Sequence, residues 1–170
     1  MFSQKDRCWK IGDFGTASEA TSKRLNTTRY SRGTTGYRAP EILVEGKAQF
    51  NNKVDIFALG CIVYEIVTGR KLFSEDWRIR QYALTGQLTQ PILWPGQSDS
   101  SFDRVQYLEM LVASMLEIDP CLRPGAPRVH AQIGLIRSGL GTENVVFERV
   151  GVPIQVTGLI HLRCANESAT

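Results

Sequence analysis

The residues best suited to chemistry lie in four short motifs. Asp13-Phe14-Gly15 comes first and is followed by Gly33-Thr34-Thr35-Gly36-Tyr37-Arg38-Ala39-Pro40-Glu41. Asp55-Ile56-Phe57-Ala58-Leu59-Gly60 and Asp119-Pro120-Cys121-Leu122-Arg123-Pro124 complete the set. They offer carboxylates, which suit a hard cation such as Mg²⁺, and an arginine, whose planar fork can bind a carboxylate with two hydrogen bonds. A lone Asp-Phe-Gly is weak evidence, so the signal lies in the order and spacing of all four.

In this order the four motifs resemble the C-terminal lobe of eukaryotic-type protein serine/threonine kinases, over roughly residues 8 to 138. The resemblance implies a mainly α-helical fold and transfer of the γ-phosphate of Mg-ATP to serine or threonine hydroxyls of proteins. Residues 13–41 would form the activation segment of such an enzyme. Tyrosine kinases usually carry a different run before Ala-Pro-Glu, so Gly33-Thr34-Thr35-Gly36-Tyr37 favours serine/threonine substrates.

The resemblance also implies roles for single residues at the matching positions. Asp13 would bind Mg²⁺ together with the nucleotide phosphates. Phe14 is expected to pack into the core and set an active or inactive geometry, and Gly15 would supply the backbone freedom for that change. Thr34 matches the threonine that touches the catalytic aspartate and lysine in the substrate pocket. The plainer interpretations are an exposed loop aspartate at position 13 and an ordinary Gly-Thr turn at 33–34.

The stretch between Gly15 and Ala39 is rich in Ser, Thr, Arg and Gly and is predicted to be a long loop. Thr27, Thr28 and Ser31 are candidate regulatory phosphorylation sites within it. A phosphate adds about −1.5 to −2 charge and can order a loop by pairing with arginines. A solvated polar loop is the alternative for each of them. The basic residues nearby are Lys23, Arg24, Arg29, Arg32 and Arg38.

Three further positions are implied to be structural rather than catalytic. Glu41 and Arg123 resemble the buried ion pair that anchors the end of the activation segment. Asp55 matches the aspartate that holds the catalytic-loop backbone from the central helix, where a buried carboxylate needs donors. Phe57 stands where the family commonly has tryptophan, a mild departure.

The kinase pattern also requires a Gly-rich loop, a strand lysine and a His-Arg-Asp catalytic loop, and no such set occurs in order here. We therefore expect the chain to begin just past the catalytic loop and to be inactive alone, with ATP and Mg bound well only by a complete enzyme. Its partners would be protein substrates or regulators and the missing N-terminal lobe and catalytic loop. The alternative function is a non-catalytic kinase-like module that binds a kinase's partners as a decoy.

Composition is that of an ordinary globular domain, with 42% hydrophobic and 22% charged residues. A net charge of +3 is too small to indicate nucleic acid binding, and the basic loop lacks aromatic stacking partners. The four cysteines form no CxxC pair, which disfavours a zinc site and a disulfide framework. The N-terminus does not resemble a signal peptide and no apolar run is long enough to span a membrane, so we expect an intracellular protein, cytoplasmic with the nucleus left open.

The sequence predicts four longer helices and a short one that starts at Pro40 and continues through Leu43. Residues 54–68 are apolar nearly all round, so neighbours should enclose them, and without an upstream helix one apolar face would be exposed. Amphipathic spacing predicts helices over 75–85, 102–117 and 126–138, with Gly69 and Gly86 ending the first two. Residues 1–138 would form the kinase-like domain. Residues 139–170 form a tail, for which short strands and a loosely ordered segment are both open.

Overall fold

The computed structural model describes residues 2–17, 25–28, 32–88 and 102–138. Ser31, the 89–101 connection and the 139–170 tail lie outside the described residues. The helices of the described part are α1 (Lys53–Thr68), α2 (Asp76–Thr85), α3 (Phe102–Met115) and α4 (Ala126–Ser138). Its strands are β1 (Phe2–Ser3), β2 (Cys8–Trp9), β3 (Asn26–Thr28) and β4 (Ala48–Phe50), and two 3-10 turns cover Phe14–Thr16 (η1) and Pro40–Ile42 (η2). This part of the chain is therefore mainly helical, as predicted.

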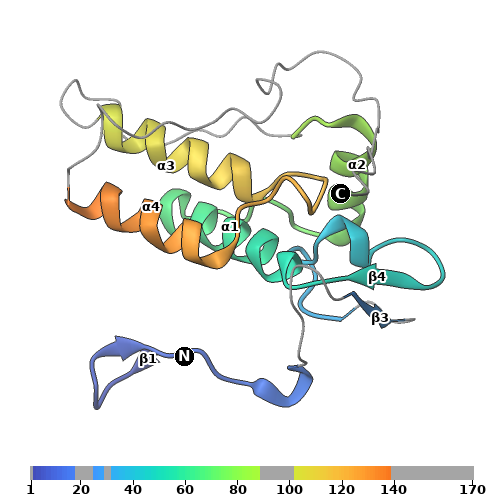
Figure 1. Cartoon of the computed structure of the whole chain (residues 1–170), viewed down its shortest axis with the longest axis horizontal. Coiled ribbons are helices and arrows are strands. Elements are labelled where there is room, and N and C mark those ends of the chain that lie inside the picture. Colours follow the sequence, from blue (N-terminus) through green and yellow to red (C-terminus); the bar gives the residue numbers. More distant parts are fainter. Residues whose placement is uncertain (1, 18–24, 29–31, 89–101, 139–170) are drawn as a thin grey trace, which may run out of the picture.

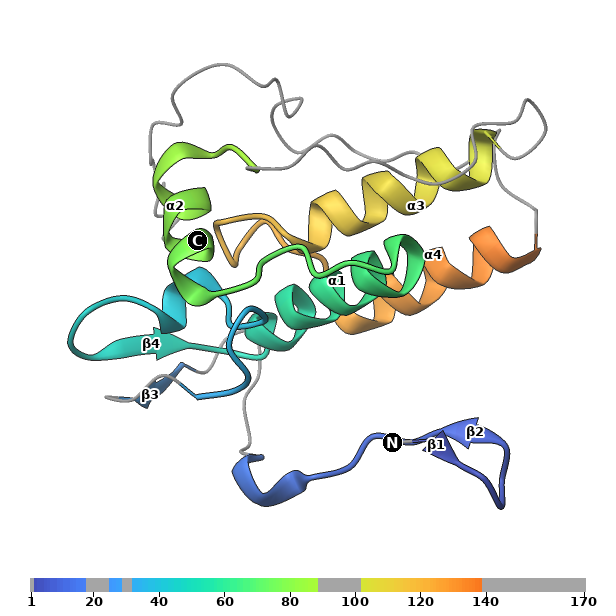
Figure 2. The same ribbon diagram turned by 180° about the vertical axis from the view of Figure 1, so that it is seen from behind.

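Helices α1, α3 and α4 lie side by side, with α2 across one end (Figure 1, and from behind in Figure 2). Gly60 sits where α1 meets the end of α3. A Cβ built at Gly60 would lie 3.1 Å from Met115 Cβ and 3.2 Å from Leu116 Cδ2, so the two helices approach closely only because that side chain is missing. The apolar run of residues 54–68 is thus used to bury one long side of α1 against α3.

Two glycines end helices where the sequence indicates. Gly69 and Gly86 adopt the left-handed conformation after α1 and α2, with φ of 68° and 67°. Gly69 N–H donates to Glu65 O at 2.8 Å, and Gly86 N–H donates to Tyr82 O at 2.8 Å. These bonds satisfy carbonyls that the last helical turn would otherwise leave open.

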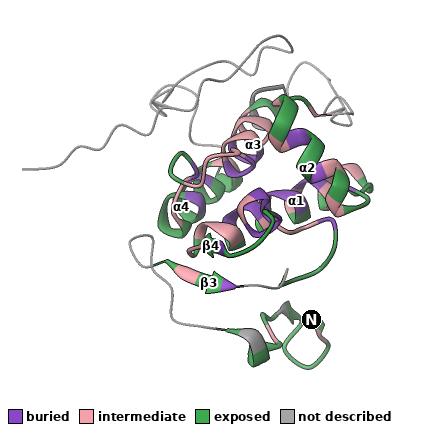
Figure 3. Ribbon diagram, turned by 90° about the vertical axis from the view of Figure 1, so that its right-hand side faces the viewer, coloured by how far each residue is buried: buried purple, intermediate pink, exposed green. Residues whose placement is uncertain are grey.

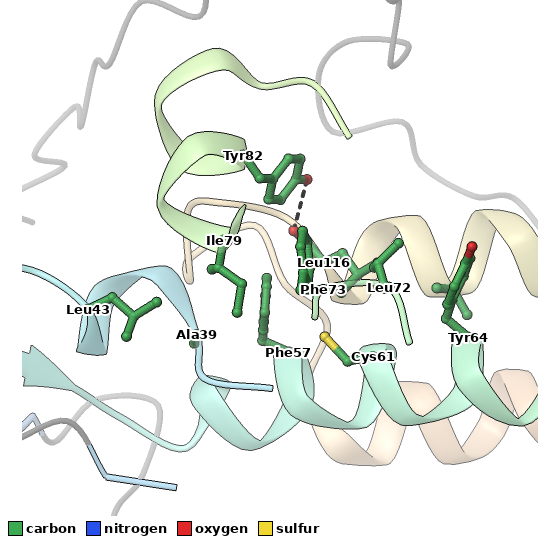
Figure 4. Packing of buried hydrophobic residues seen from close by; sticks show 11 residues of the cluster. Ala39, Leu43, Phe57, Cys61, Tyr64, Leu72, Phe73, Ile79, Tyr82 and Leu116 are labelled. Atoms are coloured by element: carbon green, nitrogen blue, oxygen red, sulfur yellow. Dashed lines mark hydrogen bonds between the residues drawn. The ribbon is translucent and has the colours of Figure 1, made fainter. Parts of the chain in front are cut away.

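The core lies where α1, α2, α3 and the turn at Ala39–Leu43 meet (Figure 4). The Phe57 and Phe73 rings stack with centroids 6.1 Å apart, and the tilted ring of Tyr82 has its centroid 5.7 Å from that of Phe73. Tyr82 Oη donates to Leu116 O at 3.1 Å, so its polar end is satisfied inside the core. Each buried aromatic or aliphatic side chain here contributes about 1.5–3 kcal/mol.

The 16–38 stretch is not loop throughout. Residues 26–28 form β3, which pairs antiparallel with β4 so that Asn26 faces Phe50 and Thr28 faces Ala48. The prediction of a long loop was wrong at these residues, because the partner strand lies 20 residues further along and local composition does not indicate it. The pairing joins residues 26–28 to β4, the strand that directly precedes α1 (Figure 3).

One face of α1 is exposed and apolar. Leu59, Ile62 and Ile66 fall on a single stripe and are 37%, 42% and 76% exposed. The sequence predicted such a face for a helix that is apolar nearly all round. Among the helices of the described segments, none is long and apolar enough to cross a bilayer.

Candidate functional site

The site is built on a tight turn that precedes η2. Tyr37 N–H donates to Thr34 O at 3.1 Å, and Gly33 and Gly36 take φ of 88° and 85°. A Cβ at Gly36 would lie 2.5 Å from Phe73 O, so only glycine fits this position without displacing backbone. The two glycines flank a turn whose outer residues, Thr34 and Thr35, are exposed.

A carboxylate at the start of α2 holds this turn. Gly36 N–H donates to Asp76 Oδ1 at 2.9 Å, and Arg38 Nη1 donates to Asp76 Oδ2. Arg38 Nε also donates to Gly33 O at 2.9 Å. The Arg38 and Asp76 side chains are 20% and 21% exposed, so this ion pair is screened by water less than a surface pair.

A second anchor comes from α1. Tyr37 Oη donates to Glu65 Oε2, and Lys71 Nζ lies 5.1 Å from the centroid of the Tyr37 ring. The hydrogen bond to Glu65 is the main reason that the pKa of Tyr37 rises to about 12, with burial a smaller cause. Tyr37 therefore stays a neutral donor throughout the physiological range.

Directly after the turn, Glu41 meets Arg123 in the interior. Arg123 Nη1 donates to Glu41 Oε1 at 2.7 Å and Arg123 Nη2 donates to Glu41 Oε2 at 2.8 Å, a bidentate pair between residues 82 apart. The Arg123 side chain is fully buried and that of Glu41 is 14% exposed. The structure thus brings together the two residues that the sequence paired.

All three guanidinium nitrogens of Arg123 donate hydrogen bonds. Arg123 donates to the carbonyls of Glu117 at 2.6 Å, Ile118 at 3.0 Å and Lys53 at 3.1 Å. Its guanidinium carbon lies 5.0 Å from the Phe57 ring centroid. One buried cation therefore joins η2, the first turn of α1 and the segment after α3, which fixes the base of the turn at residues 33–38.

The Asp13-Phe14-Gly15 segment is exposed, in contrast to the buried Glu41–Arg123 pair. Asp13 is exposed and takes a left-handed conformation with φ of 63°, and Phe14 and Gly15 enter η1. Phe14 is 69% exposed, so the expected packing of this ring into the core is wrong for this structure. The expectation rested on a family position, whereas burial of a ring requires neighbouring side chains to cover it.

Asp13 is suited to be one oxygen ligand of Mg²⁺, which typically takes one or two carboxylates and completes its shell with phosphates and water. In the segments that the structure describes, no three His, Cys, Asp or Glu side chains gather closely enough to hold a metal. Asp13 is the one residue that the sequence predicts as a metal ligand. The N-terminal segment that contains it, blue in Figure 1, lies apart from the helices.

The remaining predicted residues are separated as well. Asp55 stands exposed in the first turn of α1, yet partial desolvation raises the pKa of its carboxyl. No donor among the described residues bonds Asp55. Thr27 and Thr28 both lie in β3, where Thr27 is exposed and Thr28 is 6% exposed. A kinase could reach the Thr27 hydroxyl in this arrangement but not that of Thr28.

Sequence reasoning missed Asp76, Glu65 and the bonds of Arg38. Asp76 does carry a local signal, because an acidic residue in the first turn of a helix is favoured by the helix dipole. That signal explains the preference for an acid at this position of α2 and does not indicate a partner 38 residues earlier.

The model of the protein kinase domain matches residues 1–132 of this chain. The chain belongs to the protein kinase family. The match contains both the held turn and the buried Glu41–Arg123 pair, and it ends within α4. The mainly helical architecture agrees with a kinase-like fold.

Individual kinases support the same assignment. The chain is 35% identical over 120 residues to the serine/threonine-protein kinase Nek1 of Toxoplasma gondii, covering 69% of this chain and 7% of that protein. It is 30% identical over 125 residues to the serine/threonine-protein kinase chk-2 of Caenorhabditis elegans, covering 71% and 24%. It is 40% identical over 127 residues to the dual specificity protein kinase shkE of Dictyostelium discoideum, covering 73% and 17%. The chain therefore spans about a quarter or less of the length of these kinases.

Proposed function

We propose that this chain is the part of a protein serine/threonine kinase that seats the phosphate-accepting protein, namely a C-terminal lobe with its activation segment at residues 13–41. The observation that carries the proposal is the turn at residues 33–38. It presents two exposed threonines, it is bonded to α2 through Gly36 and to α1 through Tyr37, and the buried Glu41–Arg123 pair fixes its base. The serine/threonine kinases among the similar proteins support this choice of substrate class.

In the complete reaction, the γ-phosphoryl group of Mg-ATP passes to a serine or threonine hydroxyl of a protein. Bound Mg²⁺ would neutralise negative charge on the phosphates, and Asp13 would supply one oxygen to it. Thr34 presents an exposed hydroxyl from a fixed turn, so it would orient the segment that carries the accepting residue. Positioning of this kind is a large part of phosphoryl-transfer catalysis.

The test is phosphorylation of a protein or peptide substrate by the natural protein that contains this sequence. We expect Thr34→Ala to lower the rate at least tenfold, since it removes the hydroxyl proposed to orient the acceptor. Thr35→Ala is the matched control, because Thr35 is the exposed neighbour on the same turn. Equal rates for both variants and the unmodified protein would contradict the proposed role of the turn.

A regulatory role of the preceding strand is a second part of the proposal. Thr27 is the candidate phosphorylation site that the exposure of its side chain favours, and Arg32 and Arg38 are the nearest described arginines that follow it. Mass spectrometry of the protein isolated from its own cells, before and after phosphatase treatment, tests this assignment. Phosphate on Thr28 without any on Thr27 would oppose it.

A non-catalytic module that binds the partners of a kinase is the alternative function. The exposed stripe of Leu59, Ile62 and Ile66 favours it, because an apolar face of this kind marks an interaction surface. Substitution of Asp13 separates the two functions. Loss of phosphate transfer in Asp13→Ala supports the enzyme, whereas a protein that never transfers phosphate but binds a kinase substrate through the stripe supports the module.

A further inference from the structure

Asp76 is the link between the turn at residues 33–38 and the rest of the molecule on the α2 side. We propose that Asp76 is a positioning residue that holds this turn in the shape that receives the accepting protein segment. This inference rests on the proposed function of the turn. Asp76 acts through its hydrogen bonds to Gly36 and Arg38.

The geometry assigns both carboxylate oxygens of Asp76 to the turn. Oδ1 accepts from the Gly36 amide at 2.9 Å, and Oδ2 accepts from the Arg38 guanidinium. Because Gly36 is buried, its amide would otherwise be an unsatisfied donor. Arg38 then reaches back to the carbonyl of Gly33 at 2.9 Å. These three hydrogen bonds join residues on both sides of Thr34 and Thr35, and they are called the bracket below.

No neighbouring acid on the described part of α2 duplicates this bracket. Glu75 precedes Asp76 directly, but its side chain is exposed and no bond joins it to the turn. The carbonyl of Phe73 crowds Gly36 from the same side, so the turn is pressed against this segment and held there by Asp76. Loss of the carboxylate should therefore free the turn locally while the buried Glu41–Arg123 pair still anchors its base.

Hydrogen exchange on the full chain tests the bracket. We expect Asp76→Ala to speed exchange of the Gly36 amide about tenfold or more, since a charge-assisted hydrogen bond is lost. Asp76→Asn keeps an acceptor for Gly36 but loses the charge, and Arg38→Met keeps the Gly36 bond, so both should show smaller increases. Glu75→Ala is the matched control and should leave exchange at residues 33–38 unchanged. Exchange in α1 and α3 should stay the same in all variants, which excludes global destabilisation.

Peptide binding tests the positioning role separately. The probe is a degenerate peptide pool with a central serine, compared with the same pool carrying alanine there. We expect Asp76→Ala to weaken serine-dependent binding several-fold and Glu75→Ala to have no effect. Unchanged Gly36 exchange in Asp76→Ala would overturn the bracket, and faster exchange with unchanged peptide binding would overturn its role in positioning. If the unmodified chain shows no serine-dependent binding while Gly36 exchange still depends on Asp76, the proposed function fails, and the inference built on it fails too.

Discussion

The Asp13-Phe14-Gly15 motif and the turn at residues 33–38 both indicate a kinase, but only the turn is held by contacts with distant residues. The turn at residues 33–38 and η2 beyond it are held by α1, by α2 and by Arg123 from the far end of the described chain. The Asp13-Phe14-Gly15 segment lies against none of these elements and is exposed to solvent along its length (Figures 1 and 3). A short motif therefore identifies a family without showing whether its residues are held in place.

The difference follows from where each motif finds its partners. The turn bonds Glu65 and Asp76, and η2 beyond it bonds Arg123, all within the described chain. In the described segments the contact made by this motif is local, namely the bond from Ala17 N–H to Phe14 O at 3.0 Å. Tertiary partners, rather than the motif itself, decide which segment is rigid.

The largest expected effect comes from the buried ion pair. Glu41→Ala should destabilise the protein by about 3–5 kcal/mol, because the fully buried guanidinium of Arg123 loses its counter-ion. Such a loss is a large part of the stability of a typical domain. Urea unfolding followed by circular dichroism measures it. Glu45→Ala is the control, since Glu45 is an exposed acid close by in sequence. Similar midpoints for the two variants would show that the pair does not anchor the turn.

The tight fit of Gly36 is expected to have the next largest effect. Gly36→Ala should cost about 2–4 kcal/mol, the sum of left-handed backbone strain and overlap with Phe73 O. Gly46→Ala is a matched control, because Gly46 has φ of 87° but no atom within 4 Å of the added Cβ. The difference in unfolding free energy between the two variants isolates the overlap. No difference would mean that the turn is not pressed against the backbone at Phe73.

Local patterns predicted much of the scaffold. The helix expected over 75–85 is observed as Asp76–Thr85, and Gly69 and Gly86 end their helices as expected. Helical periodicity and glycine stops are encoded within a few residues, so one sequence suffices to find them. The contact between Glu41 and Arg123 was inferred from a resemblance, since nothing near either residue indicates the other.

What the sequence did not reveal depends on the tertiary arrangement. The β3–β4 pairing and the contacts of Arg38 and Asp76 join segments 20 to 40 residues apart, with no local feature to mark them. Phe14 shows the opposite failure. Its family position implied a buried ring, but burial requires partner side chains that the described residues do not place there.

The hydrogen bond from Tyr37 to Glu65 is expected to contribute less than Gly36. Tyr37→Phe should lower the unfolding free energy by about 1–2 kcal/mol at neutral pH. Because the pKa of Tyr37 is about 12 in the folded chain and 10.0 is its ordinary value, this contribution is complete below pH 10 and is lost as the pH rises through 12. Unfolding free energies of both proteins between pH 7 and 11 should therefore converge at the alkaline end. A gap that widens with pH would contradict the assignment.

The smallest expected effect is at Phe14, and it tests the comparison between the two motifs most directly. Phe14→Ala should change the unfolding free energy by less than about 0.5 kcal/mol, because a ring that is 69% exposed has little burial to lose. Phe57→Ala, at a fully buried ring of the same type, should cost about 3–5 kcal/mol and shows that the assay detects lost packing. If Phe14→Ala instead costs more than about 2 kcal/mol, the ring is buried in solution. The Asp13-Phe14-Gly15 motif would then be held in place as firmly as the turn at residues 33–38, and a rigid segment would orient the Asp13 carboxylate toward a metal.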